Sequence, residues 1–282
     1  FHSGKNFGMA ETRKSKFKGW QRVLMILIPY FAVMVLSEFL ALLLLGLESL
    51  DPALGLTPFQ EMVTALFVLA GTALLVGLFR KWVDRESFVS LGFPFKNRGQ
   101  DVLSGLLAGL VIMALGFASL RLMGEIRVET VAFHAGSLLL SLLVFVFVGI
   151  GEELLMRGYV LNNLMLSMNR YVALVVASLI FAAMHLLNPH FSLITFFTIF
   201  FSGILLGMSY LFTRNLWFPI ALHFSWNFFQ GTIFGFNVSG RDDYSLIEQS
   251  RSRDTVLNGG PFGFEGSILS IGLILASVYL VW

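Results

Sequence analysis

The sequence predicts an all-α, polytopic membrane protein with about eight transmembrane helices. Of its 282 residues, 56% are hydrophobic and only 13% are charged, whereas a soluble domain has about 25% charged residues. The mean hydropathy is +0.80. The apolar residues are gathered in long runs, and one bilayer crossing takes about 20 apolar residues.

Charged and turn-forming stretches separate the apolar runs and therefore mark the ends of the helices. The clearest breaks read ESLDPALGLTP, RKWVDRESFVSLGFPFKNRGQ, LNPH and TRNLWFP. We expect a tail over 1–21 and a single transmembrane domain over 22–282. The helices are predicted at 22–47, 60–80, 101–123, 134–166, 171–188, 192–213, 217–235 and 264–282.

The distribution of Lys and Arg predicts the orientation of the chain, because cytoplasmic loops of membrane proteins are enriched in these residues. The tail and the loop over 80–100 are rich in Lys and Arg, whereas the loop over 48–60 has none. Arg170 and Arg214 lie at turns on the same side as the tail. Both termini are therefore predicted to be cytoplasmic.

The net charge of +2 is too small to indicate a nucleic-acid partner, and the absence of cysteine excludes disulfides and a cysteine nucleophile.

Ionisable residues within the apolar runs are the candidate functional residues, because each costs several kcal/mol unless it is paired or functional. In FVGIGEELLMRGYV, Glu153 and Arg157 are four residues apart and share one helix face. Glu152 is turned by about 100° from Glu153. Arg157 is therefore expected to neutralise Glu153 and to leave Glu152 available for another role.

Two later helices carry further polar residues at the same spacing of four. His223 and Asn227 place an imidazole beside a carboxamide, and the Phe181 ring is expected to brace His185. Taken singly, such residues are often only hydrogen-bonded contacts between membrane helices. Taken together, they predict one polar site inside the helix bundle.

The depth of these residues supports this prediction. If the chain turns near residues 167–169, Glu152 and His185 each lie about 16 residues from the turn and would meet across an antiparallel helix hairpin. His223 begins its helix after a turn on the same side and can reach a similar depth. We expect the site to lie in the cytoplasmic half of the bilayer.

A carboxylate facing an imidazole can hold a water molecule and take its proton as the water attacks a carbonyl. A second imidazole and an amide NH₂ can stabilise the resulting oxyanion. Glu152, His185 and His223 could instead hold a zinc ion, and the spacing does not decide between these two arrangements. The sequence has no GxSxG or HExxH motif.

Three ordered motifs resemble those of the CPBP family of intramembrane proteases, which includes the type II CAAX prenyl endopeptidases and bacterial bacteriocin-processing (ABI) proteins. The motifs are EExxxR in EELLMR, FxxxH in FAAMH and HxxxN in HFSWN. The likeness covers roughly 85–282, including the SLGF stretch, with a protease core at about 134–235.

The resemblance implies a role for each motif residue. Glu152 would be the catalytic carboxylate, with His185 helping it to activate water, and His223 and Asn227 would form the oxyanion site. Three further residues would support the site, namely Glu153, Arg157 and Phe181. Zinc remains open as a cofactor.

The resemblance also implies an intramembrane endopeptidase in a bacterial inner membrane, acting on a membrane-associated protein or peptide. Two alternatives remain open. One is a non-catalytic immunity or scaffold protein with a vestigial site. The other is a proton or small-solute transporter that uses Glu152 and His185 as a relay.

Overall fold

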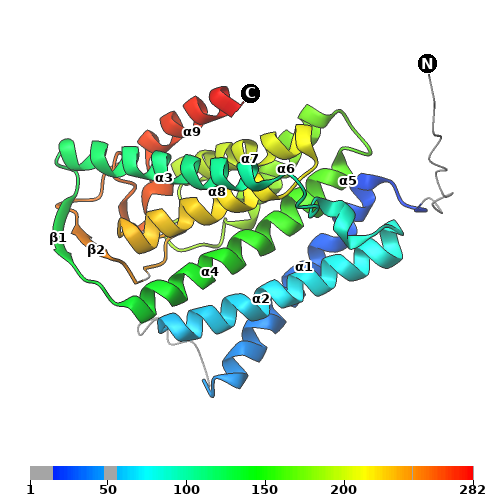
Figure 1. The fold of residues 1–282 in the computed structure, drawn as a ribbon, viewed down its shortest axis with the longest axis horizontal. Coiled ribbons are helices and arrows are strands. Elements are labelled where there is room, and N and C mark those ends of the chain that lie inside the picture. The colour runs from blue at the N-terminus through cyan, green and yellow to red at the C-terminus, as the bar shows by residue number, and fades with distance from the viewer. Residues whose placement is uncertain (1–14, 48–55, 243, 282) are drawn as a thin grey trace.

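A computed structural model describes residues 15–47, 56–242 and 244–281, which form a bundle of helices with a small sheet at one end (Figure 1). Residues 1–14 of the predicted tail and part of the predicted loop over 48–60 lie outside the described residues. The α-helices are α1 Gly19–Leu44, α2 Pro58–Phe79, α3 Gly99–Leu122, α4 Ala135–Glu153, α5 Asn162–Leu164, α6 Arg170–Met184, α7 Leu193–Thr213, α8 Trp217–Asn227 and α9 Ile268–Val281.

Three of these helices have π-helical extensions, and short 3₁₀ turns connect others. The π-helical segments are η1 Arg80–Asp84, η3 Leu154–Leu161 and η4 Phe228–Ile233, and the 3₁₀ segments are η2 Phe88–Leu91, η5 Gly260–Phe262 and η6 Phe264–Gly266. Because η3 and α5 continue α4, and η4 continues α8, the helical segments coincide with the predicted ones to within a few residues.

Five helices of the described chain are long and apolar enough to cross a membrane. They are Gly19–Leu44, Pro58–Asp84, Gly99–Leu122, Ala135–Leu164 and Leu193–Thr213. The segments Arg170–Met184 and Ile268–Val281 are apolar but shorter. The prediction of a helical polytopic membrane protein is therefore confirmed, whereas the number of eight full spans stays a prediction.

The described chain also contains two short strands that the sequence analysis did not predict. β1, Arg127–Val131, pairs antiparallel with β2, Ile247–Ser250, and the register shifts between Val128 and Thr130. These strands lie more than a hundred residues apart in the chain, and such long-range pairing leaves no local pattern. The sheet ties the segment before α4 to the loop after η4 (Figure 1).

Helix α8 is held between α3 and α4 by close backbone approaches (Figure 1). A Cβ at Gly105 would lie 2.6 Å from the carbonyl oxygen of Phe218, and one at Gly109 would lie 2.6 Å from the Ser225 side chain. On the other side, a Cβ at Gly149 of α4 would lie 3.3 Å from the backbone nitrogen of Phe224. Glycines thus allow α8 to pack deep in the bundle.

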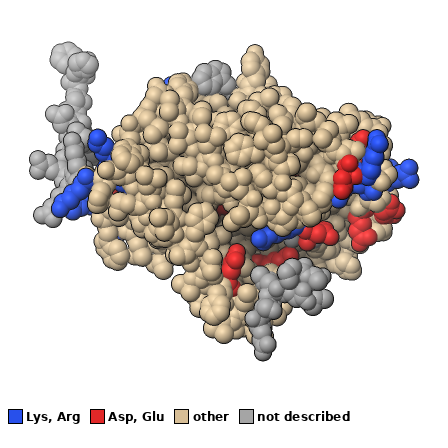
Figure 2. All heavy atoms as spheres, turned by 180° about the vertical axis from the view of Figure 1, so that it is seen from behind, with Lys and Arg blue, Asp and Glu red and all other residues tan. Residues whose placement is uncertain are grey.

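Charged side chains are unevenly spread over the surface. In Figure 2 they gather at the two ends and along the lower edge of the molecule, and the broad central face is almost entirely uncharged. Large hydrophobic side chains are exposed on α1, among them Ile28, Val35 and Leu43. This pattern is that of a protein whose middle faces lipid.

Candidate active site

Two of the motif-bearing helices change from α to π geometry at their motifs, within EExxxR in one and directly after HxxxN in the other. Helix α4 ends at Glu153 and continues as η3, which carries Arg157. Helix α8 ends at Asn227 and continues as η4. π-helical turns are rare in proteins, and those that occur are often at functional sites. Both transitions therefore indicate a functional site near these motifs.

Glu153 lies at the centre of this region. Its side chain is fully buried, and its Oε1 accepts a hydrogen bond from Arg157 Nη1 at 2.8 Å. The same oxygen is 2.7 Å from His223 Nδ1. Arg157 also donates through Nη2 to the carbonyl oxygen of Gly203 in α7 at 3.0 Å. The predicted Glu153–Arg157 pair is thus confirmed, and it joins α4 and η3 to α7 and α8.

Glu152 approaches the opposite edge of the same imidazole. Its Oε2 lies 3.8 Å from His223 Nε2, and its side chain is 31% exposed. That distance is too long for a hydrogen bond. Glu152 Oε2 is buried and has no hydrogen-bond partner in the described part of the chain, so it remains an unused acceptor beside the imidazole.

His185 caps the end of α6, and the predicted contact with the Phe181 ring is confirmed, with the two rings edge to face and their centroids 4.8 Å apart. His185 Nδ1 lies 2.8 Å from the Phe181 carbonyl oxygen. Because a carbonyl only accepts, Nδ1 is the donor in this bond and Nε2 is left as an acceptor in the neutral ring. Phe181 also lies edge-on to His223, at 6.2 Å, and beneath the Arg157 guanidinium, at 4.7 Å.

The predicted meeting of Glu152 with His185 is not formed in the described residues, where the imidazole that approaches Glu152 is His223. The estimate from equal distances to the turn assumed a regular α-helix with a rise of 1.5 Å per residue. Eight residues of this helix form the π-helical η3 instead. The wider i→i+5 turns shift the depth and the rotation of Glu152 relative to α6.

Asn227 lies one turn after His223 and is buried, with 5% of the residue exposed. Its carboxamide forms no hydrogen bond with any other described residue. The amide NH₂ group is therefore available as a donor and is suited to bind a ligand oxygen.

Sequence reasoning missed one contributor. The Gly203 carbonyl of α7 accepts a hydrogen bond from Arg157 Nη2 at 3.0 Å. A backbone carbonyl leaves no motif that could have identified it.

A zinc site formed by Glu152, His185 and His223 does not fit this arrangement. Among residues 15–47, 56–242 and 244–281, no group of three or more His, Asp or Glu residues is placed to hold a metal ion.

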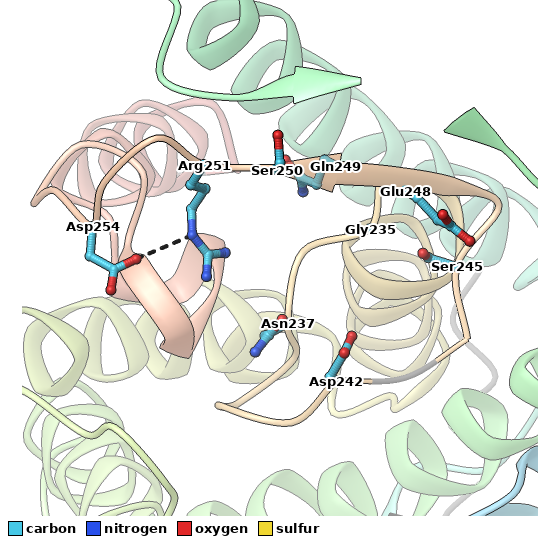
Figure 3. Close-up of a pocket in the computed structure, with 9 residues that line it drawn as sticks. All are labelled: Gly235, Asn237, Asp242, Ser245, Glu248, Gln249, Ser250, Arg251 and Asp254. Carbon is cyan, nitrogen blue, oxygen red and sulfur yellow. Dashed lines mark hydrogen bonds and ion pairs between the residues drawn. The ribbon is translucent and has the colours of Figure 1, made fainter. Parts of the chain in front are cut away.

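A separate polar pocket of about 480 Å³ lies in the segment after η4. Figure 3 shows acidic and amide side chains around it, with Arg251 paired to Asp254. None of the predicted site residues lines this pocket. It is distinct from the Glu153–His223 centre.

These features define a class of protein, an integral membrane protein of the helical type with buried carboxylate, imidazole and carboxamide groups gathered between its helices. Residues 134–229 match the model of the family described as "Type II CAAX prenyl endopeptidase Rce1-like". This match agrees with the resemblance indicated by the three motifs. No curated protein and no solved structure gives a match.

Proposed function

We propose that the protein is an intramembrane endopeptidase that hydrolyses a peptide bond of a membrane-associated protein or peptide near the cytoplasmic side. The observation that carries the proposal is the placement of Glu152 and His223. Glu152 Oε2 and His223 Nε2 lie 3.8 Å apart, so the carboxylate and the imidazole can act together on one water molecule bound beside them. The family match supports protease chemistry for the segment that carries them.

In this mechanism Glu152 is the general base. Glu153 accepts the proton of His223 Nδ1, which fixes the ring and leaves Nε2 directed to the water. Glu152 takes a proton from the water as the water oxygen attacks the scissile carbonyl, and it returns that proton to the leaving amine. Arg157 neutralises the buried Glu153, so that the site carries one free carboxylate.

Asn227 supplies the oxyanion donor. Its amide has no partner among the described residues and lies on the same helix as His223, so it can donate to the tetrahedral oxygen. His185 Nε2 is free to accept a hydrogen bond from substrate or water. We place His223 rather than His185 beside the attacking water because His223 is the imidazole that faces Glu152.

We further propose that the basic end of the bundle faces the cytoplasm. Arg22, Arg80, Arg170 and Arg214 lie at the helix ends of this side, as the positive-inside rule requires.

The test is cleavage of a membrane-anchored reporter by purified wild-type protein, Glu152→Gln and His223→Ala in lipid vesicles. The reporter is offered with and without a prenylated C-terminal cysteine, because the name of the matched family refers to such substrates. We expect cleavage by the wild type and loss of at least about 100-fold in each variant. Equal cleavage by all three proteins would remove these residues from the mechanism. Proton or solute flux through the same vesicles, lost in Glu152→Gln and without cleavage, would favour the transporter.

A further inference from the structure

The end of α2 carries a buried ion pair outside the segment matched by the family. Arg80 and Asp84 of η1 are joined by a contact of 2.9 Å between Nη1 and Oδ2, and their side chains are 6% and 0% exposed. Buried ion pairs seldom add net stability, because desolvation offsets the attraction. Their partners therefore indicate what this pair does.

Asp84 contacts the helix that carries the first motif. Tyr159 of η3 donates its hydroxyl to Asp84 Oδ1 at 3.2 Å, and Asn163 of α5 donates through Nδ2 to Oδ2 at 3.4 Å. Arg22 of α1 approaches the same carboxylate at 3.5 Å. Tyr159 follows Arg157 closely within η3, so Asp84 fixes the segment whose guanidinium holds Glu153.

Arg80, the other member of the ion pair, contacts the SLGF stretch and the residues before it. Its Nη2 donates to Ser90 Oγ at 2.7 Å, and its Nε donates to the Ser87 carbonyl at 3.4 Å. The backbone carbonyls of Gly92 and Phe93, which follow in the SLGF stretch, bind the start of α8. Gly92 accepts from the Leu216 amide at 2.9 Å, and Phe93 accepts from Trp217 Nε1 at 3.1 Å.

Gly92 allows the SLGF stretch to pack closely against the segment that leads into α8. Its φ is +126°, and a Cβ there would lie 3.0 Å from the Leu216 side chain and 3.1 Å from the Arg214 carbonyl. No other residue type fits that conformation and that space without strain. Helix α8 begins at Trp217 and carries His223 and Asn227.

We propose that the Arg80–Asp84 pair is a positioning junction that sets the placement of α8 relative to η3, and hence the contact of His223 with Glu153. The pair reaches both motif-bearing elements from a helix that carries no motif residue. The expected effect of the junction on catalytic activity rests on the proposed function. Its effect on the placement of η3 and of the start of α8 does not.

Two measurements on Arg80→Gln, Asp84→Asn and the double variant test the junction. The first is kcat and KM for the reporter, and the second is hydrogen exchange of peptides covering 154–164 and 214–220. The control is Arg98→Gln, which removes the partly exposed Arg98–Asp101 pair. We expect kcat to fall about 10- to 100-fold with little change in KM, and the double variant to resemble the single variants. Exchange should rise in both peptides, and the control should match the wild type.

Arg80→Lys separates the contacts of Asp84 with η3 from the contacts of Arg80 with the SLGF stretch. Lysine keeps a charge for Asp84 but lacks the guanidinium fork that also reaches Ser87 and Ser90. We expect faster exchange in 214–220 alone. Unchanged exchange in 214–220 for both Arg80 variants would overturn the junction, as would a lower unfolding temperature with unchanged kcat. If the wild type cleaves no reporter but the exchange pattern holds, the proposed function fails and the junction stands.

Discussion

One oxygen of Glu153 accepts from both Arg157 Nη1, at 2.8 Å, and His223 Nδ1, at 2.7 Å. The first motif therefore does not offer two equivalent carboxylates. Glu153 holds an arginine and an imidazole in place, and the preceding residue, Glu152, approaches the other edge of that imidazole. The pair of adjacent glutamates thus supplies one positioning group and one reactive group.

Glu153→Gln is expected to cost both stability and activity. It leaves the Arg157 guanidinium, which is 3% exposed, without a counter-charge, and such losses cost about 3–5 kcal/mol. The free energy of unfolding in detergent measures this effect. Asp101→Asn is the control, because its pair with Arg98 is partly exposed and is worth less than about 1 kcal/mol. Equal effects of the two substitutions would contradict the central role of Glu153.

A double-mutant cycle separates the two histidines. Because Glu152 and His223 are proposed to hold one water, Glu152→Gln/His223→Ala should lose no more kcat than the worse single variant. Glu152→Gln/His185→Ala should lose more than either single variant, since no contact joins that pair among the described residues. The measurement is kcat in single-turnover reporter cleavage. The reverse pattern would restore the pairing of Glu152 with His185 that the sequence predicts.

The comparison of these histidines shows what the sequence could predict. The apolar runs identify the helices because each is bounded by charge or turn residues, and the Glu153–Arg157 and Phe181–His185 contacts follow from spacing within one helix. The Glu152–His223 approach depends on the rotation of α8 against α4 and on the π-helical turns of η3. No periodicity reports either feature. The β1–β2 pairing and the Arg80–Asp84 junction likewise join segments that are distant in the chain.

Asn227→Ala tests the oxyanion donor. Removal of one such donor typically lowers kcat by about 10²–10³ and leaves KM nearly unchanged. Ser225→Ala is the control on the same helix, because the Ser225 hydroxyl donates to the Leu106 carbonyl at 2.6 Å and faces α3. We expect Ser225→Ala to alter stability and to leave kcat close to the wild-type value. A KM effect without a kcat effect in Asn227→Ala would assign the amide to substrate binding instead.

Gly109→Ala tests the packing that seats α8. A Cβ there would lie 2.6 Å from the Ser225 side chain and 2.8 Å from the Trp226 backbone nitrogen, and such overpacking costs about 1–3 kcal/mol. Because α8 would shift, kcat should fall as well. In Gly272→Ala the added methyl meets nothing within 4 Å, so this variant of α9 should be as stable as the wild type or slightly more stable. Thermal unfolding in detergent compares the two, and equal midpoints would contradict the close approach of α3 to α8.

Chelation distinguishes a water activated by Glu152 from a water bound to zinc. Because no group of three or more His, Asp or Glu residues in the described chain is placed to hold a metal ion, we expect reporter cleavage to survive prolonged treatment with a strong chelator. Metal analysis of the purified protein should give well under one zinc per chain. Loss of cleavage on chelation, with recovery on adding zinc, would mean that Glu152, His185 and His223 regroup around a metal. In that case Glu152→Gln should also weaken zinc binding, whereas a general base removed by the same substitution would leave zinc binding unchanged.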